Sequence, residues 1–169
     1  LEKLKKMRAQ GVTAYAATFD RTHTLAEGKE VKDGKKLTVA GRVVLLRDMG
    51  KMSFLTLQDH TGRLQVMLKE ENLGDAYKEA LSLIDLGDFI GITGENFTTQ
   101  KGEPTVLAKE WSMLSKALRQ PPEKRHGIAD QETAWRQRYL DTMSNRDTFE
   151  RFQFRSRFIQ KMREFYWKN

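Results

Sequence analysis

Cysteine is absent from the 169 residues, and proline and histidine each occur only three times. Without cysteine, a disulfide scaffold and a thiolate metal site are both excluded. His23, His60 and His126 are too far apart in sequence for the ligand spacing of a zinc site. No apolar run approaches the ~20 residues that a membrane span needs, and the basic first residues lack the apolar stretch of a signal peptide. These absences predict a cytoplasmic protein without a metal site or a membrane segment.

Positive charge is abundant, because 30 lysine and arginine residues outnumber 23 aspartate and glutamate residues, for a net charge of +7. Such an excess favours a polyanionic partner, either a nucleic acid or an acidic membrane surface, although it also serves solubility alone. Hydrophobic residues make up 38% of the chain and charged residues 31%. This balance indicates a modest core with long segments that are exposed or face a partner.

The first segment, residues 1–36, opens with Leu1, Leu4 and Met7 at helical spacing among lysines. This spacing predicts a short amphipathic helix. The remainder of the segment is polar and rich in turn-forming residues, and it shows no clear period. We therefore expect a helix followed by an irregular connector.

The next segment, residues 37–114, contains five β-branched and apolar runs of strand length and one stretch with a helical apolar face. The predicted strands are 37–48, 52–59, 63–69, 88–98 and 105–114, with the helix between the third and fourth. This element order is that of the five-stranded OB-fold barrel, although other small all-β barrels remain open. His60, Thr61 and Gly62 are predicted to form the tight turn after the second strand, where Gly62 is free to take positive φ.

The last part of the chain changes character again. Residues 115–130 contain two adjacent prolines and many charges, which predicts a linker. Residues 131–169 are predicted to be helical, with Asn145 as the N-cap of the second helix. The apolar stripe of that helix consists of Phe152, Phe158, Ile159, Met162, Phe165 and Tyr166. This stripe indicates a partner domain that follows in the chain, or else packing of the helix back on the barrel.

Side chains alternate across a strand, so residues of one parity share a face. Leu55 and Leu57 in the second strand, and Val66 in the third, predict which parity is the barrel interior. Phe54 and Gln65 then point outward from adjacent strands, on the face that OB folds use for oligonucleotides. An exposed ring is a surface on which a base can stack, and an amide can bond the Watson–Crick edge of a splayed base. The alternatives are a domain contact for Phe54 and a solvated side chain for Gln65.

Basic residues surround this pair, and Arg42, Lys51 and Arg63 are candidate phosphate contacts. Arg47 is a further RNA-binding candidate, but simple alternation from Leu45 would turn it inward. Either the strand bulges near Gly41 or it ends before Arg47.

Glu103 lies in the turn between the last two predicted strands. Its carboxylate is able to accept a hydrogen bond from an exocyclic amine or from a ring N–H of a base. The alternative for a lone carboxylate in a turn is simple solvation.

Two sequence blocks carry a family resemblance. VAGRVVLLRDMGKMSFLTLQDHTGRLQV resembles the anticodon-binding OB domain of class IIb aminoacyl-tRNA synthetases. Its tripeptide Met49-Gly50-Lys51 is similar to that of lysyl-tRNA synthetases of the bacterial type, whereas aspartyl and asparaginyl relatives usually differ there. LSKALRQPPEKRHGIADQETAWRQRYLD resembles the segment that joins the barrel to the catalytic domain in the lysyl family.

The resemblance implies roles for four matching residues. Phe54 would stack on an anticodon uridine, and Gln65 would bond the central uridine. Arg47 would contact the anticodon bases or backbone, and Glu103 would contribute to discrimination. The implied partner is the anticodon stem-loop of lysine tRNA.

The resemblance also implies properties of a longer protein. Such synthetases activate lysine with ATP and Mg²⁺, esterify tRNA and form homodimers, using a catalytic domain of which 131–169 would be only the helical start. Their catalytic motifs have no counterpart here, so we expect RNA binding without catalysis from these residues. Three other possibilities are a free-standing single-strand-binding OB protein, an aspartyl or asparaginyl relative, and a catalytic-only paralogue that modifies an elongation factor. The last lacks a barrel.

Overall fold

The computed structural model describes residues 1–119, 121–122, 128 and 130–168. The chain divides into two compact units, Leu1–Gln120 and Pro121–Asn169. The predicted linker spans the boundary between these units, and its residues 120, 123–127 and 129 lie outside the described residues. Each unit is therefore a body in its own right.

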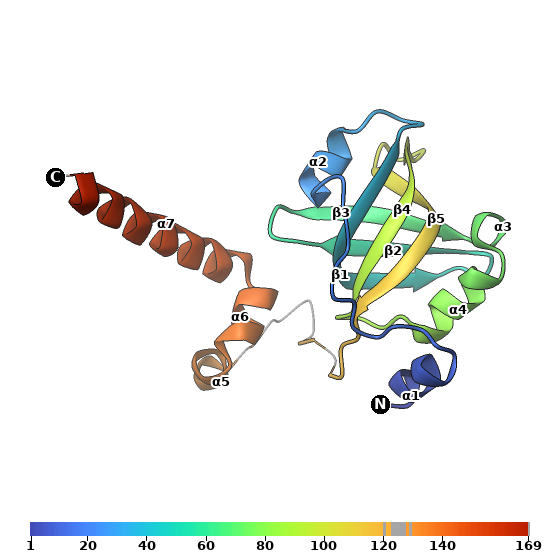
Figure 1. The fold of residues 1–169 in the computed structure, drawn as a ribbon, viewed down its shortest axis with the longest axis horizontal. Helices are drawn as coiled ribbons and strands as arrows, with labels where there is room; N and C mark the ends of the chain where they lie inside the picture. The colour runs from blue at the N-terminus through green and yellow to red at the C-terminus, as the bar shows by residue number, and fades with distance from the viewer. Residues whose placement is uncertain (120, 123–127, 129, 169) are drawn as a thin grey trace. The chain divides into compact units, whose positions relative to one another are not determined.

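The first unit is a closed barrel with the strand order β1-β2-β3-β5-β4 (Figure 1). The strands are β1 Lys36–Asp48, β2 Met52–Gln58, β3 Arg63–Lys69, β4 Phe89–Thr98 and β5 Pro104–Ser115. All pairings are antiparallel except that of β3 with β5, which is parallel and closes the barrel. The predicted OB-fold order is confirmed.

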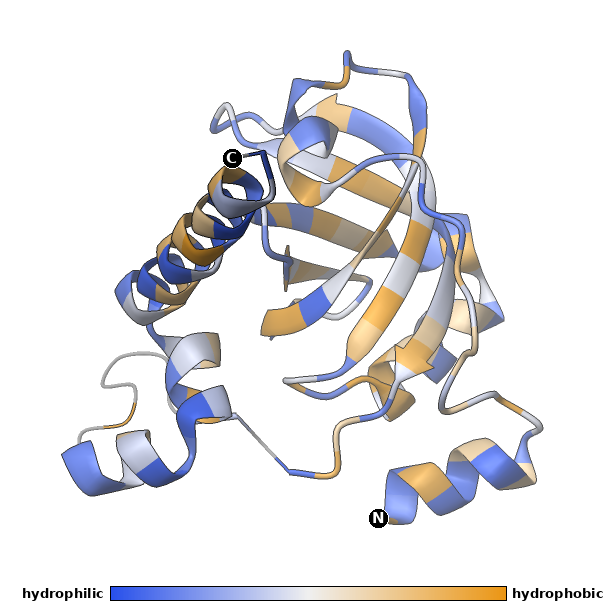
Figure 2. Ribbon diagram, turned by 60° about the vertical axis from the view of Figure 1, so that its left-hand side comes forward, coloured by the Kyte–Doolittle hydropathy of each residue, from blue (hydrophilic) through white to orange (hydrophobic). Residues whose placement is uncertain are grey.

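The barrel interior is filled by side chains of one parity on each strand. Leu55, Leu57 and Val66 are fully buried, whereas Phe54 and Gln65 on the other parity are only half-buried. Figure 2 shows this alternation as hydrophobic and hydrophilic bands along the strands. The face assignment made from the leucines is therefore correct.

Two helices cover different ends of this core (Figure 1). Helix α2, Leu25–Glu30, places Leu25 in the core and brings Gly28 against the Leu64 end of β3. Helix α4, Asp75–Leu83, buries Tyr77 against Ser53 at the other end of the hairpin, and short α3, Glu70–Leu73, precedes it.

Helix α2 was not expected, because residues 11–36 were predicted to be an irregular connector. Thr24 and Glu27 form a reciprocal capping box at its start. That Thr-x-x-Glu spacing was present in the sequence and was the signal that could have revealed the helix.

A buried ion network ties the N-terminal helix α1, Glu2–Ala9, to the barrel. Lys116 Nζ lies 2.7 Å from both Asp85 Oδ2 and Asp88 Oδ2. Asp85 also pairs with Lys3 of α1 at 2.7 Å. Lys116 and Asp88 are almost wholly removed from water, so their charges depend on each other.

A β-bulge in β1 decides which way Arg47 points. The register between β1 and β2 shifts by one residue between Val43 and Leu45. Because of this shift, Val43 is buried and Leu46 also packs against the core, while Arg47 is exposed on the outer side. The expected bulge is therefore real, but it lies beyond Gly41, and β1 continues past Arg47.

The predicted turn joins β2 to β3, but it does not use the positive φ that Gly62 was free to take. The Asp59 carboxylate holds the turn instead, because Oδ1 accepts from the backbone N–H of Thr61 at 2.7 Å and from that of Gly62 at 3.0 Å. A side chain that caps the turn in this way removes the need for a left-handed glycine.

The second unit is helical, with α5 Gln131–Arg136, α6 Arg138–Ser144 and α7 Arg146–Lys168. Asn145 Oδ1 accepts from the backbone N–H of Asp147 at 3.1 Å, which confirms its predicted role as N-cap. All six residues of the predicted apolar stripe of α7 are exposed, and Figure 2 shows hydrophobic and hydrophilic bands alternating along this helix. No helix among the described residues has both the length and the apolar character needed to cross a membrane.

Candidate nucleic-acid interface

The outer side of the β1–β2–β3 sheet carries the predicted aromatic and amide as diagonal neighbours. Arg47 of β1 lies opposite Phe54 of β2, and Phe54 lies opposite Met67 of β3. Gln65 lies two residues before Met67 and pairs with Thr56. Directly opposite residues of an antiparallel pair share a face, and diagonal ones lie about 7–8 Å apart. A single extended nucleotide chain can therefore reach the ring and the amide together.

Phe54 and Gln65 sit on this face with different degrees of restraint. Both are half-buried. No hydrogen bond or ring contact among the described residues holds the Phe54 ring, so its outer surface is able to accept a base. Gln65 Nε2 donates to Thr105 Oγ1 at 2.9 Å, which anchors the amide to the neighbouring strand β5.

Glu103 is brought to the same edge by the turn between β4 and β5. Its backbone N–H donates to Thr99 Oγ1 at 3.1 Å, and its carbonyl accepts from the Thr99 backbone N–H at 3.0 Å. Gly102, with φ of 77°, closes the turn in a conformation that favours glycine. The Glu103 side chain is exposed, and within the described residues it has no ion-pair partner. The backbone of this turn is thus fixed while its carboxylate faces solvent.

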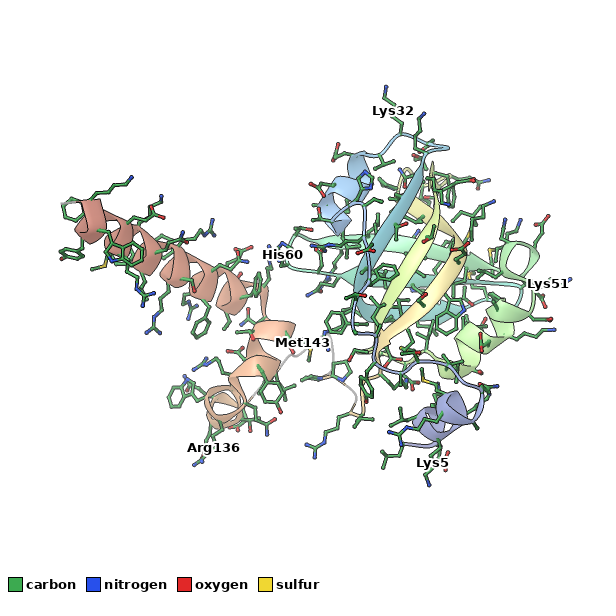
Figure 3. The ribbon with its side chains drawn as sticks, in the orientation of Figure 1. Lys5, Lys32, Lys51, His60, Arg136 and Met143 are labelled. Atoms are coloured by element: carbon green, nitrogen blue, oxygen red, sulfur yellow. The ribbon has the colours of Figure 1, made fainter. Side chains whose placement is uncertain are left out.

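Lys51 lies in the turn between β1 and β2, four residues after Arg47 in the sequence. Gly50 has φ of 86°, and its N–H donates to Asp48 Oδ1 at 2.9 Å. Tyr77 Oη donates to the Gly50 carbonyl, which ties the turn to α4. Figure 3 shows Lys51 and His60 at opposite ends of the β2–β3 hairpin. Lys51 is exposed and so adds a positive charge at the Phe54 end of the face.

Arg42 and Arg63 lie at the other end of the face, both paired with Gln58. The Arg42 guanidinium stacks 4.3 Å from the Phe89 ring centroid and donates to the Gly87 carbonyl at 3.2 Å. Burial lowers the pKa of Arg42 from its ordinary value. Arg42 is thus half-buried and held by the barrel itself, unlike an exposed phosphate contact. Arg63 is exposed and donates through Nε to Gln58 Oε1 at 2.7 Å, which leaves its terminal nitrogens toward solvent.

Thr105 is a member of this constellation that sequence reasoning missed. It lies beside Gln65 only because β3 and β5 pair in parallel. The two residues are 40 positions apart, and no local sequence pattern predicts such a contact.

Among the described residues, no group of three or more His, Asp or Glu side chains is placed to hold a metal ion.

Comparison with protein families identifies the domain. Residues 37–114 match the tRNA-anticodon family model, which is described as an OB-fold nucleic acid binding domain. These residues belong to that OB-fold family. The matched range coincides with the predicted domain and contains all five strands of the barrel apart from single residues at the ends of β1 and β5.

Lysine–tRNA ligases are similar to nearly the whole chain, not to the OB domain alone. The chain is 42% identical to the enzyme of Dehalococcoides mccartyi strain 195 and covers 35% of that relative, with 98% of this chain aligned. It is 43% identical to the enzyme of Carboxydothermus hydrogenoformans, covering 34% of it with 98% of this chain. For the Enterococcus faecalis enzyme the identity is 39%, with 35% and 97% covered. The chain is thus a homologue of lysine–tRNA ligases and spans about a third of their length.

Proposed function

We propose that the outer face of the OB domain binds the anticodon loop of lysine tRNA. The observation that carries this proposal is a set of three side chains on one face, with Arg47 opposite Phe54 and Gln65 diagonal to Phe54. Glu103 lies in the adjoining turn, where its backbone carbonyl accepts from Thr105, the residue beside Gln65. Phe54 stacks on one base, Gln65 bonds the edge of a neighbouring base, and Glu103 accepts from a third. Arg47, Lys51 and Arg63 neutralise phosphates.

The activity of the whole protein is part of the same proposal. Similarity to lysine–tRNA ligases supports the proposal that the whole protein joins lysine to tRNA, using ATP and Mg²⁺. We propose that it does so in the cytoplasm, as a homodimer. Residues 1–169 correspond to about a third of the length of such a ligase. No chemical step is therefore assigned to this chain, and residues 1–169 alone are expected to bind RNA without aminoacylating it. The catalytic domain, with residues 131–169 as its helical start, would supply the chemistry.

Binding to matched RNA stem-loops tests this proposal. Residues 1–169 should bind a stem-loop with the anticodon UUU at least about tenfold more tightly than one with an unrelated anticodon, a difference of ~1.4 kcal/mol. Equal affinity for all anticodons would instead support a sequence-tolerant single-strand-binding OB protein. Preference for an aspartate or asparagine anticodon would assign the domain to those relatives.

A further inference from the structure

Thr105 is a polar residue buried at the edge of the proposed RNA site. It is 0% exposed, although it pairs with half-buried Gln65 on the outer side of the sheet. Its hydroxyl has two neighbours: Gln65 Nε2 at 2.9 Å and the Glu103 carbonyl oxygen at 3.1 Å. A buried hydroxyl with two polar neighbours restricts what each neighbour can present to it.

Donor and acceptor accounting fixes the orientation of the Gln65 amide. A carbonyl oxygen can only accept, so the single hydroxyl proton of Thr105 goes to Glu103. The Thr105 oxygen is then left with lone pairs toward Gln65, and only the NH₂ end of the amide can bond it. If the amide were reversed, Gln65 Oε1 and the Glu103 carbonyl would compete for the one Thr105 proton, so one of the two bonds of this hydroxyl would be lost, although the Glu103 carbonyl would still accept from the Thr99 backbone N–H.

The fixed orientation determines which edge Gln65 offers to a base. With Nε2 turned to Thr105, the Oε1 acceptor has no hydrogen-bond partner among the described residues, and neither does one Nε2 hydrogen. An outward acceptor matches a base with a ring N–H on its Watson–Crick edge, which uracil and guanine have. Cytosine and adenine have a ring nitrogen acceptor at that position, so wherever Oε1, and not the free Nε2 hydrogen, meets the ring nitrogen, two lone pairs would face each other.

We propose that Thr105 is a positioning residue for base specificity: it locks the Gln65 amide so that this amide selects a base with a ring N–H over one with a ring acceptor. Its hydroxyl also bonds the Glu103 backbone and so keeps the amide and the β4–β5 turn in one arrangement. The selection step rests on the proposed RNA-binding function, whereas the locking of the amide does not depend on it.

The locking is tested without RNA, by NMR of the Gln65 side-chain amide. In the wild-type domain, one Nε2 proton should exchange slowly with solvent. Thr105→Val, which keeps the shape and removes the hydroxyl, should make that exchange fast, and Thr105→Ser should restore slow exchange. Fast exchange in the wild type would overturn the proposal by itself, even if Thr105→Val failed to fold.

The selection is tested by replacing each anticodon uridine with cytidine in turn. At one position, Thr105→Val should lower the uridine-over-cytidine affinity ratio about twofold to tenfold, the equivalent of one net hydrogen bond, and Thr105→Ser should not. Thr93→Val is the matched control, because it also removes a threonine hydroxyl that bonds across two strands. Thr93 Oγ1 on β4 lies 3.2 Å from Thr38 Oγ1 on β1. This control should leave the ratio unchanged.

The outcomes separate the two proposals. An equal loss of affinity for uridine and cytidine in Thr105→Val would mean that Thr105 is merely structural, which overturns the inference. If the wild-type domain binds none of the stem-loops, anticodon recognition fails and selection by Thr105 fails with it. The NMR result would still decide whether the hydroxyl locks the amide.

Discussion

The Arg42 guanidinium lies 4.3 Å from the centroid of the Phe89 ring, across the pairing of β1 with β4. It also donates to the Gly87 carbonyl at the end of the loop that follows α4. Arg42 therefore stabilises the barrel, although its position in the sequence made it a candidate phosphate contact. The distinction between structural and RNA-facing cations leads to the first two predictions.

Arg42→Ala is expected to destabilise the barrel by about 1–3 kcal/mol, because it removes a cation–π contact and a hydrogen bond from a charged donor. The free energy of unfolding should be measured with the Trp111 indole N–H as an NMR probe, since that group donates to the Ala76 carbonyl inside this unit. Arg63→Ala, on the exposed side of the same row, is the control and should change stability by less than about 0.5 kcal/mol. Similar losses in both variants would contradict the structural role of Arg42.

Arg47→Ala and Lys51→Ala should each reduce the salt dependence of RNA binding. For single strands, the slope of log affinity against log salt falls by about 0.7 for each phosphate contact that is lost. Lys32→Ala is a suitable control, because Lys32 is also exposed and Figure 3 shows it far from Lys51. Slopes that match the wild type in both test variants would remove these cations from the interface.

Phe54→Ala should weaken stem-loop binding by about 1–3 kcal/mol, the usual value of one base stacked on an aromatic ring. Phe54→Trp should retain most of the affinity, since the stacking surface remains, whereas Phe54→Leu keeps only apolar bulk. Isothermal titration with the UUU stem-loop measures the affinity, and thermal unfolding checks that each variant is folded. Unchanged affinity in a folded Phe54→Ala domain would exclude the ring from the site.

Lys116→Met should destabilise the barrel by about 3–5 kcal/mol, because it leaves the buried Asp88 carboxylate without its cation. Lys3→Met removes only a partly exposed pair with Asp85 and should cost about 0–1 kcal/mol. The double variant Lys116→Met, Asp88→Asn should recover part of the loss. Chemical denaturation of the three variants gives the comparison, and equal effects at Lys116 and Lys3 would be inconsistent with a buried network.

The Asp59 turn should make barrel stability fall in acid. Partial burial opposes ionisation of this carboxyl, but hydrogen bonds from Thr61 Oγ1 and from the backbone N–H groups of Leu25, Gly62 and Thr61 outweigh it and lower its pKa. A lowered folded-state pKa contributes stability that is complete above the unfolded value of about 3.9 and is lost as pH falls through the folded value. The stability difference between wild type and Asp59→Asn should therefore shrink below about pH 4. A difference that is constant from pH 7 to pH 3 would contradict this.

The alternation in β2 and β3 was sufficient to predict which side of the barrel Phe54 and Gln65 occupy. Period-two patterns report sidedness directly when one face is apolar. The run Val43-Val44-Leu45-Leu46 has no such alternation, so the position of the bulge, and with it the direction of Arg47, was not determined by the local pattern. Sequence parity thus predicts a face only where the two faces differ in polarity.

Contacts between distant strands were outside the reach of sequence reasoning. The hydrogen bond from Gln65 to Thr105 depends on closure of the barrel, and the cation–π contact of Arg42 with Phe89 depends on the β1–β4 register. Charge alone made Arg42 and Arg63 equivalent. Only tertiary pairing separates a cation that supports the fold from one that is available to a phosphate.

The extra residue in β1 also has a consequence for how this chain tolerates insertions and deletions. Loss of one residue between Val43 and Leu46 would restore an uninterrupted ladder with β2 in which Leu46 still lies opposite Leu55 and Arg47 opposite Phe54, so both side chains would keep their present sides. A single-codon deletion there should therefore preserve the outward direction of Arg47. Added residues in the exposed turn around Lys51 would likewise change only the reach of that turn.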